Sequence, residues 1–362
     1  MWGIKKENAI LILSHDYKLH NQSSMPEKIL YILGAGASAY ALPLAKNFCD
    51  ESGNIKKPGL AKELRDFELE KYFLDYRVEP WPVDLVKIKQ EWAELAENAD
   101  KFGDVDTYAK YLKIIGEEKK LQQLKQSLSE YFAIKQLIEK ATDKRYLPWL
   151  VSIMNKKIFP GNIKVLNWNY DFQIQLAFEN FSPLEDIDHS GSGFSHSGLP
   201  LQYYPNLDAT YNDFHLLSMI HLNGIAGYIK QKNFYTASIF QKKHGSSKDS
   251  ILEFLKEHYA NPQINFAWEN NQYHQPLNKH INKMIEDTTI AVVIGYSFPF
   301  FNREIDKQIF EQLKEIQEFK TIYYQDPVLT GQQLYSQFNL DRDLINIIHI
   351  QQTNNFHIPF EY

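Results

Sequence analysis

A glycine-rich stretch near the N-terminus has the composition of a phosphate-binding turn. An apolar run over 29–33 stops at Gly34-Ala35-Gly36-Ala37-Ser38, and a helix-like segment follows as far as residue 48. In a strand–turn–helix unit, glycines let the backbone approach a pyrophosphate while N–H groups and the helix dipole face the anion. The stretch lacks the third glycine of the usual dinucleotide fingerprint, so a purely structural tight turn is the alternative.

Further polar residues that could do chemistry follow later apolar runs. In an open α/β sheet, ligands bind outside the carboxyl ends of the strands. We therefore expect the polar residues at these strand ends to converge with the glycine turn, however distant they are in sequence. They are Asn169 and Asp171, His221 and Asn223, Gly295, Tyr296 and Ser297, and Asp326.

Several of these residues also have a structural explanation. Asn169 and Asp171 disfavour strand interiors, so they could simply form a turn or cap a helix. A single strand histidine such as His221 is more often a hydrogen-bonded core residue than a catalytic one. The other histidines show no metal-ligand spacing, and we predict no metal site.

The apolar runs that precede these residues predict the fold. Runs within 162–172, 216–228, 288–298 and 320–328 have strand character, and helical stretches lie between several of them. Apolar strands that alternate with helices predict an α/β fold with a Rossmann-like, doubly wound parallel sheet. The Ser-, Gly- and His-rich stretch 186–207 predicts a long surface loop.

The remaining sequence divides into an arm and an insertion. Residues 1–27 are polar and irregular, and we interpret them as an N-terminal arm. Apolar residues recur at helical spacing from Leu60 to about Asp143, which predicts an all-helical insertion over 59–144. The Rossmann-like domain then comprises 28–58 and 145–362.

Composition narrows the class of protein. The net charge is −6 and gives no overall electrostatic footprint for nucleic acid, so we expect no direct nucleic-acid partner. The one cysteine, Cys49, excludes an internal disulfide and a Cys-based zinc cluster, and it fits a reducing compartment. No apolar run approaches the roughly 20 residues that span a bilayer. We expect a soluble, cytoplasmic protein without a membrane partner.

The motifs in combination are more specific than any one of them. Gly34-Ala-Gly-Ala-Ser38, Trp168-Asn-Tyr-Asp171, the IHLNG of 220–224 and Gly295-Tyr-Ser297 occur in this order. In this the chain resembles the sirtuin superfamily, and most closely the sirtuin-like NADases of bacterial antiphage defence. The resemblance covers roughly 29–50 and 145–330.

The resemblance implies roles for individual residues. In sirtuins the glycine turn cradles the NAD pyrophosphate, a role that falls here to residues 34–38. Asn169 would then lie beside the nicotinamide ribose, and Asp171 would meet the carboxamide. Residues 295–297 would lie near the adenosine. Asp326 could accept hydrogen bonds from the adenine-ribose hydroxyls, as strand-end acids do in related folds.

Two departures from the family pattern affect the expected chemistry. Protein-deacylating sirtuins carry a four-cysteine zinc module, which cannot exist here. This absence of a zinc site disfavours deacylation and leaves cleavage of the nicotinamide–ribose bond with water as acceptor. The family also usually has Leu-His-Gly where this chain has Leu222-Asn223-Gly224.

The identity of the general base therefore stays open. His221 lies two residues before Asn223 and would share its face on an extended strand, so it could act as the base. Alternatively, Asn223 holds the ribose in a slow site, or it is a silencing substitution.

The resemblance implies an NAD+ hydrolase, with NAD as substrate, that depletes NAD+ in antiphage defence. Such an activity requires control, and we expect a homo-oligomer or a partner such as a HerA-type ATPase. The alternatives are an ADP-ribosyltransferase that uses the same site, and a non-hydrolysing NAD- or ADP-ribose-binding module.

Overall fold

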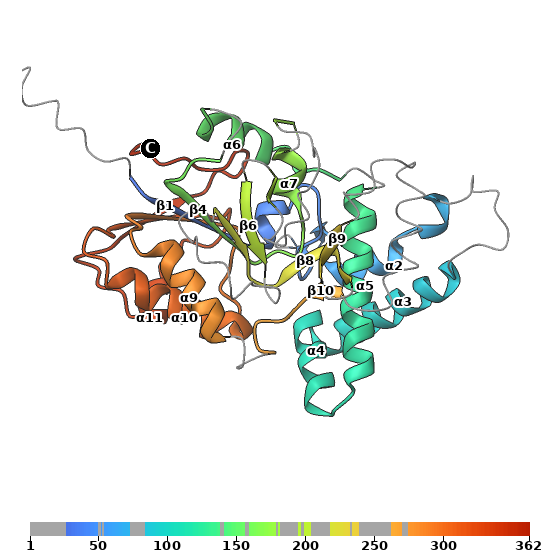
Figure 1. Cartoon of the computed structure of the whole chain (residues 1–362). Helices are drawn as coiled ribbons and strands as arrows, with labels where there is room; N and C mark the ends of the chain where they lie inside the picture. Colours follow the sequence, from blue (N-terminus) through green and yellow to red (C-terminus); the bar gives the residue numbers. More distant parts are fainter. Residues whose placement is uncertain are drawn as a thin grey trace, which may run out of the picture.

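The computed structural model describes residues 27–49, 52, 54–72, 84–137, 141–155, 159–178, 180–181, 195–196, 199–203, 218–231, 234–238, 262–269 and 274–362 (Figure 1). The predicted N-terminal arm lies, except for its last residue, outside this part of the chain. None of the helices within it is both long enough and apolar enough to cross a bilayer.

A parallel sheet forms the centre of the molecule and confirms the predicted doubly wound α/β fold. Its middle strands β1 (Ile29–Leu33) and β11 (Ile290–Ile294) are buried along their whole length, as expected for parallel strands covered on both faces. Eight strands of the described chain pair side by side, and only β5 runs antiparallel to its neighbour. Their order is β13 (Asn346–Ile350), β12 (Thr321–Gln325), β11, β1, β4 (Ile163–Asn167), β7 (Met219–His221), β6 (Leu199–Tyr203) and β5 (Ser195–His196).

The chain order reverses beside β1. From β1 the chain continues to β4, then to β5 and β6 at the sheet edge, and comes back to β7 between β6 and β4. It then crosses to β11 on the other side of β1 and continues to β12 and β13. The carboxyl ends of β1 and β11 therefore flank the topological switch point, which is where ligands bind in open α/β sheets.

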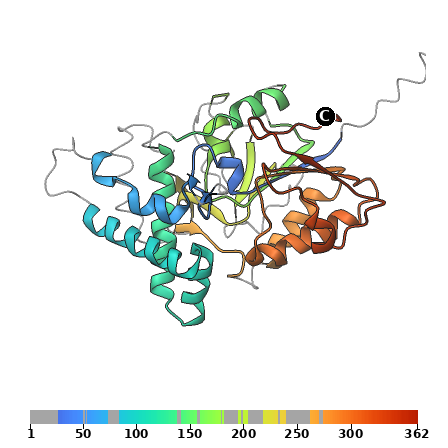
Figure 2. The same cartoon turned by 180° about the vertical axis from the view of Figure 1, so that it is seen from behind.

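Helices cover both faces of this sheet (Figures 1 and 2). One face of β1, which includes Tyr31, packs with α6 (Tyr146–Ile153) and α7 (Gln173–Phe178). The opposite face, which includes Leu30, packs with α9 (His274–Ile285), α10 (Arg303–Lys314) and α11 (Gln333–Gln337). Because successive strand residues point to opposite faces, the apolar run of β1 supplies both cores.

The predicted helical insertion has its own core, in which Trp92 and Tyr131 are fully buried. Asp84 caps α3 by accepting a hydrogen bond from the Lys87 amide, and Asp104 caps α4 through the Thr107 amide. Gly103, with a φ of 89°, separates the two helices. The helices of the insertion are α2 (Leu60–Asp66), α3 (Leu85–Phe102), α4 (Val105–Ile114) and α5 (Glu118–Leu137), with a short 3₁₀ helix η2 (Leu69–Tyr72).

A smaller antiparallel sheet connects the insertion to the central sheet. It is formed by β10 (Pro262–Ile264), β8 (Gly224–Gln231) and β9 (Phe234–Ser238), and α5 packs against β8 and β10. The described part of the run 216–228 therefore belongs to two sheets. Strand β7 ends at His221, the chain turns at Leu222 and Asn223, and Gly224 adopts a φ of 75° as β8 begins. The expectation that His221 and Asn223 share one face of an extended strand is wrong for this reason.

The segment after the glycine turn also differs from the sequence-based prediction. Instead of an α-helix, β1 is followed by one 3₁₀ turn, η1 (Ala35–Ser38), and then by a hairpin of β2 (Phe48–Cys49) and β3 (Ile55–Lys57). A single turn has few aligned peptide dipoles, so the turn offers N–H groups to a ligand rather than a full helix dipole.

The stretch predicted as a surface loop over 186–207 is not wholly a loop. Its described residues form β5 and β6, and β6 joins the central sheet beside β7. The rest of the stretch lies outside the described residues.

Candidate functional site

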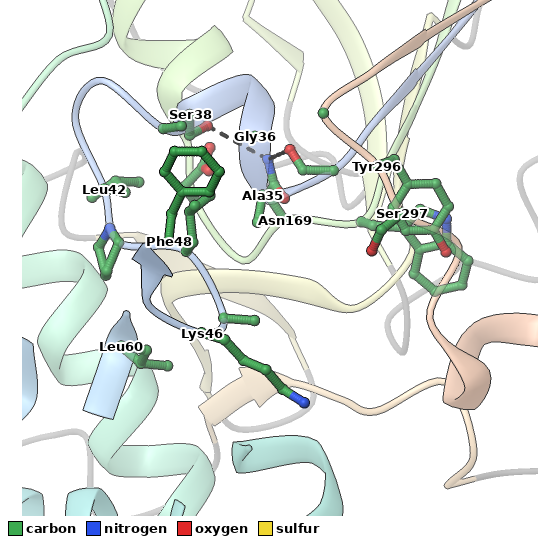
Figure 3. Close-up of a pocket in the computed structure, with 18 of the residues that line it drawn as sticks. Ala35, Gly36, Ser38, Leu42, Lys46, Phe48, Leu60, Asn169, Tyr296 and Ser297 are labelled. Carbon is green, nitrogen blue, oxygen red and sulfur yellow. Dashed lines mark hydrogen bonds between the residues drawn. The ribbon is translucent and has the colours of Figure 1, made fainter. Parts of the chain in front are cut away.

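A cavity of about 790 Å³ lies at the topological switch point (Figure 3). This volume falls within the roughly 300–1,000 Å³ typical of small-molecule and cofactor sites. Its walls come from the glycine turn, the strap of residues 39–48, the loops after β4, β11 and β12, and helices α4 and α5 of the insertion. All the sequence-predicted site residues line it except Ala37 and His221.

The glycines of the turn are required by a close approach between two chain segments. A Cβ added to Gly36 would lie 2.6 Å from the Cα of Gly295, and one added to Gly34 would lie 2.6 Å from the Gly295 carbonyl oxygen. Gly295 itself has a φ of 56°, and a Cβ there would lie 2.4 Å from the Gly36 backbone. The glycines thus allow the ends of β1 and β11 to touch, which the sequence could not show.

This contact determines which amides of the turn remain for a ligand. The amides of Gly34, Gly36 and Ala37 donate to carbonyl oxygens of the protein at N···O distances of 3.0, 2.9 and 2.8 Å. The amide of Ala35 has no acceptor among the described residues, and Ala35 is exposed to the cavity. An orphan amide at the first position of a helical turn is a donor suited to an anion.

Arg145 holds the glycine turn through its carbonyl oxygens. Its guanidinium donates to the carbonyl oxygens of Gly36 at 3.0 Å and Ala37 at 2.9 Å, and it forms a buried ion pair with Asp143 at 2.6 Å. Asp143 in turn accepts from the amide of Tyr40 at 3.0 Å. Because all these groups are paired, the turn is rigid before any ligand arrives.

Asn169 lies directly against the turn (Figure 3). Its Nδ2 donates to the carbonyl oxygen of Gly34 at 2.9 Å and lies 3.5 Å from the hydroxyl of Ser38. These bonds orient the amide and leave Oδ1 without a partner among the described residues. The Ser38 hydroxyl also lies 3.0 Å from that of Tyr146.

Asp171 completes this buried polar group. Burial raises its pKa to about 6, although hydrogen bonds from Ser38 and from the Gln173 amide act in the opposite direction. At neutral pH the carboxyl is therefore mostly ionised but close to its protonation point.

His221 lies under the cavity rather than in it. Its ring is fully buried, with Nε2 2.8 Å from the side-chain amide nitrogen of Gln175 and Nδ1 3.4 Å from the carbonyl oxygen of Asn169. Burial lowers its pKa to about 4, so the ring is neutral at physiological pH. In this position the ring supports the backbone of Asn169.

Asn223 occupies the turn between β7 and β8 and lines the cavity. Its Nδ2 donates to the carbonyl oxygen of Trp168 at 3.1 Å. Its Oδ1 is buried without a hydrogen-bond partner among the described residues. A buried, unpaired acceptor is costly, so the geometry suits a ligand that donates a hydrogen bond there.

The loop after β11 forms the wall on the other side of the turn. The Tyr296 ring stacks on Trp168, and its hydroxyl donates to Asp306 at 2.8 Å, which fixes the side chain in the core. Ser297 is exposed to the cavity, and the next residue, Phe298, has a left-handed φ of 54°. Such strain in a non-glycine residue is typical of functional loops.

Asp326 lies at the end of β12 and lines the same wall. Its Oδ1 accepts from the amides of Val328 at 2.8 Å and Leu329 at 2.7 Å, which is the arrangement of an Asx turn. No described residue pairs with Oδ2.

The insertion contributes two acids, Asp104 and Asp106, that the sequence-based prediction of the site did not include. Asp106, in the first turn of α4, lines the cavity. Burial raises its pKa to about 7, assisted by repulsion from Asp104 and opposed by Lys46. In the sequence, Asp106 can be recognised only as a neighbour of the buried helix positions Val105 and Ala109. This spacing does not reveal that α4 faces a cavity.

The chain matches no protein-family model and no curated protein. The functional argument therefore depends on the fold and the cavity. Together they define a doubly wound α/β protein with a ligand-sized cavity at its switch point, an orphan amide on the glycine turn, and unpaired acceptors on Asn169 and Asn223.

Proposed function

We propose that the protein hydrolyses NAD+ at the bond between nicotinamide and ribose. The observation that carries this proposal is the orientation of Asn169, whose Nδ2 is bound to the glycine turn while Oδ1 is left unpaired. The side chain that would act on the sugar is thus fixed by the same turn that would hold the pyrophosphate.

In this proposal the substrate lies across the switch point. The pyrophosphate meets the Ala35 amide, with Lys46 on the strap as a nearby cation. The adenosine half extends towards Ser297 and the free Oδ2 of Asp326. The nicotinamide half lies between Asn169 and Asn223.

Cleavage of the N-glycosidic bond places positive charge on the ribose as the electron pair leaves with nicotinamide. Neutral amide oxygens are suited to this step because they accept from water or sugar hydroxyls without acting as strong nucleophiles. Asn169 Oδ1 would orient the attacking water, and Asn223 Oδ1 would accept from a ribose hydroxyl. Asp171 would meet the carboxamide.

The experiment is to incubate the purified protein with NAD+ and follow nicotinamide and ADP-ribose. We expect both products in equal amounts. Protein-linked ADP-ribose would instead indicate a transferase. Intact NAD+ would indicate a binding module, an alternative favoured by the absence of histidine from the described cavity wall.

Asn169→Ala provides the internal test. We expect it to lower kcat by about 100-fold or more, because the water would no longer be oriented. Asn180→Ala is the matched control, since Asn180 is exposed and its side chain donates only to helix carbonyls of α7. Turnover of Asn169→Ala at the parental rate would contradict the proposed mechanism.

The proposal that this activity serves NAD+ depletion in antiphage defence, with self-assembly or a partner ATPase as the control, rests on the sequence resemblance alone.

A further inference from the structure

The insertion places an unpaired carboxylate in the cavity. Asp106 has no hydrogen-bond or ion-pair partner within the part of the chain that the structure describes, although it belongs to the first turn of a capped helix. The helix cap is made by Asp104, which also pairs with Lys46 at 3.2 Å. Lys46, whose charge acts on the pKa of Asp106, is thus already paired with Asp104, and the charge of Asp106 remains available to a ligand.

Asp106 also lies close to the loops that bear the proposed reactive residues. Its charge contributes, after burial, to raising the pKa of Tyr170, the residue that follows Asn169. It contributes more weakly to raising the pKa of Tyr296 in the loop after β11. Among the described titratable groups, Asp104 and Lys46 act on the pKa of Asp106, and Asp106 acts on the pKa values of these two tyrosines.

We propose that Asp106 is the general base of the NAD+ hydrolysis inferred above, on which this inference rests. The C1′–N1 bond breaks, and its electron pair leaves with neutral nicotinamide. The water oxygen bonds to C1′, and one water proton passes to the Asp106 carboxylate. The products are nicotinamide, ADP-ribose and a protonated Asp106 that returns its proton to solvent.

Other groups around the cavity are less suited to accept this proton. The side-chain amides of Asn169 and Asn223 cannot take up a proton near neutral pH. His221 is sealed under the cavity, and Asp171 already accepts hydrogen bonds from its neighbours. Asp106 is poised near neutrality, where a general base is most effective.

The lysine on β3 is a further candidate base. Burial lowers the pKa of Lys57, and it lines the cavity. The charges that act on it are those of Asp143, Arg145 and Glu63, and the charge of Asp106 is not among them.

The test is the pH profile of nicotinamide release from about pH 5.5 to 9. In the parental protein we expect kcat to fall as pH drops through an apparent pKa near 7, because the base becomes protonated. Asp106→Asn should lower kcat by about 100-fold or more and abolish this acid limb, with little change in KM. Asp106→Glu should recover part of the rate.

The variant Asp104→Asn tests whether Asp106 titrates as the base, because it changes the surroundings of Asp106 and leaves Asp106 itself in place. Asparagine can still cap α4, so the helix should persist. Loss of the Asp104 charge removes a repulsion and frees Lys46, and both effects favour the ionised form of Asp106. We therefore expect the acid limb to move to lower pH while the plateau rate is retained.

Thermal unfolding of Asp106→Asn at pH 8 adds a readout independent of activity. An acid kept only for structure would lower the unfolding midpoint when replaced, whereas removal of a desolvated charge should raise it. A parental rate in Asp106→Asn, or an acid limb that persists in it, would overturn the assignment of the base alone. Absence of nicotinamide release from the parental protein would overturn the hydrolase proposal and the base together.

Discussion

Replacement of Ala35 by proline would remove a single hydrogen-bond donor from the cavity and leave the shape of the turn unchanged. Ala35 is the first residue of η1, a position where proline is well tolerated because its backbone φ is already helical. The preceding residue, Gly34, has an extended conformation with φ −116° and ψ −174°, as a residue before proline prefers. The Ala35 amide has no acceptor among the described residues, so no internal hydrogen bond is lost.

The expected effect is on affinity alone. A hydrogen bond to a charged group contributes about 1.5–3 kcal/mol, and each 1.4 kcal/mol is a tenfold change in Kd. If the Ala35 amide contacts a phosphate oxygen, Ala35→Pro should weaken binding by about 10- to 150-fold. The melting temperature should stay the same or rise slightly, since proline restricts the unfolded chain.

Isothermal titration with ADP-ribose is the suitable assay. ADP-ribose carries the same pyrophosphate as NAD+ but has no nicotinamide bond to cleave, so turnover does not disturb the measurement. Ala35→Ser, which keeps the amide, serves as the control. Equal affinity of Ala35→Pro, Ala35→Ser and the parental protein would show that the turn does not hold the pyrophosphate through this amide.

Two further predictions concern stability. Burial lowers the pKa of His221 to about 4 in the folded protein, against an ordinary value of 6.5. The neutral ring therefore contributes to the free energy of unfolding above pH 6.5, and this contribution is lost as pH falls towards 4. In urea unfolding we expect the parental protein to lose about 2 kcal/mol relative to His221→Gln between about pH 7.5 and pH 5; parallel curves would contradict the neutral buried ring. Gly295→Ala should cost about 2 kcal/mol or more, because the residue has a positive φ and its Cβ would meet the Gly36 backbone. Gly161→Ala, where nothing lies within 4 Å of the added Cβ, should change the unfolding free energy by less than about 0.5 kcal/mol.

The central strands could be predicted from sequence because burial on both faces leaves an uninterrupted apolar run. This holds for β1 and β11. Prediction from apolar runs fails at the sheet edges, where β13 is only partly buried and β6 contains Pro200. It also misses the turn at Asn223, because a turn inside an apolar run does not change the hydrophobic periodicity.

The site was predictable only in part, for a related reason. Glycines at 34 and 36 indicate an unusual backbone conformation. The sequence does not reveal that Gly295 occupies the space that side chains at these positions would take. Helical spacing gives the buried face of α4, but it does not say that Asp106 borders a cavity whose other walls come from distant parts of the chain. Both facts arise from contacts between segments far apart in the chain.

The cavity wall is built by two different means, and this decides how each part should respond to mutation. The turn is made by backbone against backbone, at Gly34, Gly36 and Gly295, so most substitutions there alter folding and binding together. The proposed reactive groups are side chains from separate elements, namely Asn169, Asn223 and Asp106. Removal of one of these leaves the main-chain scaffold in place. Loss of one of these side chains should therefore appear in kcat with modest changes in KM, whereas Ala35→Pro should alter affinity and leave the plateau rate intact.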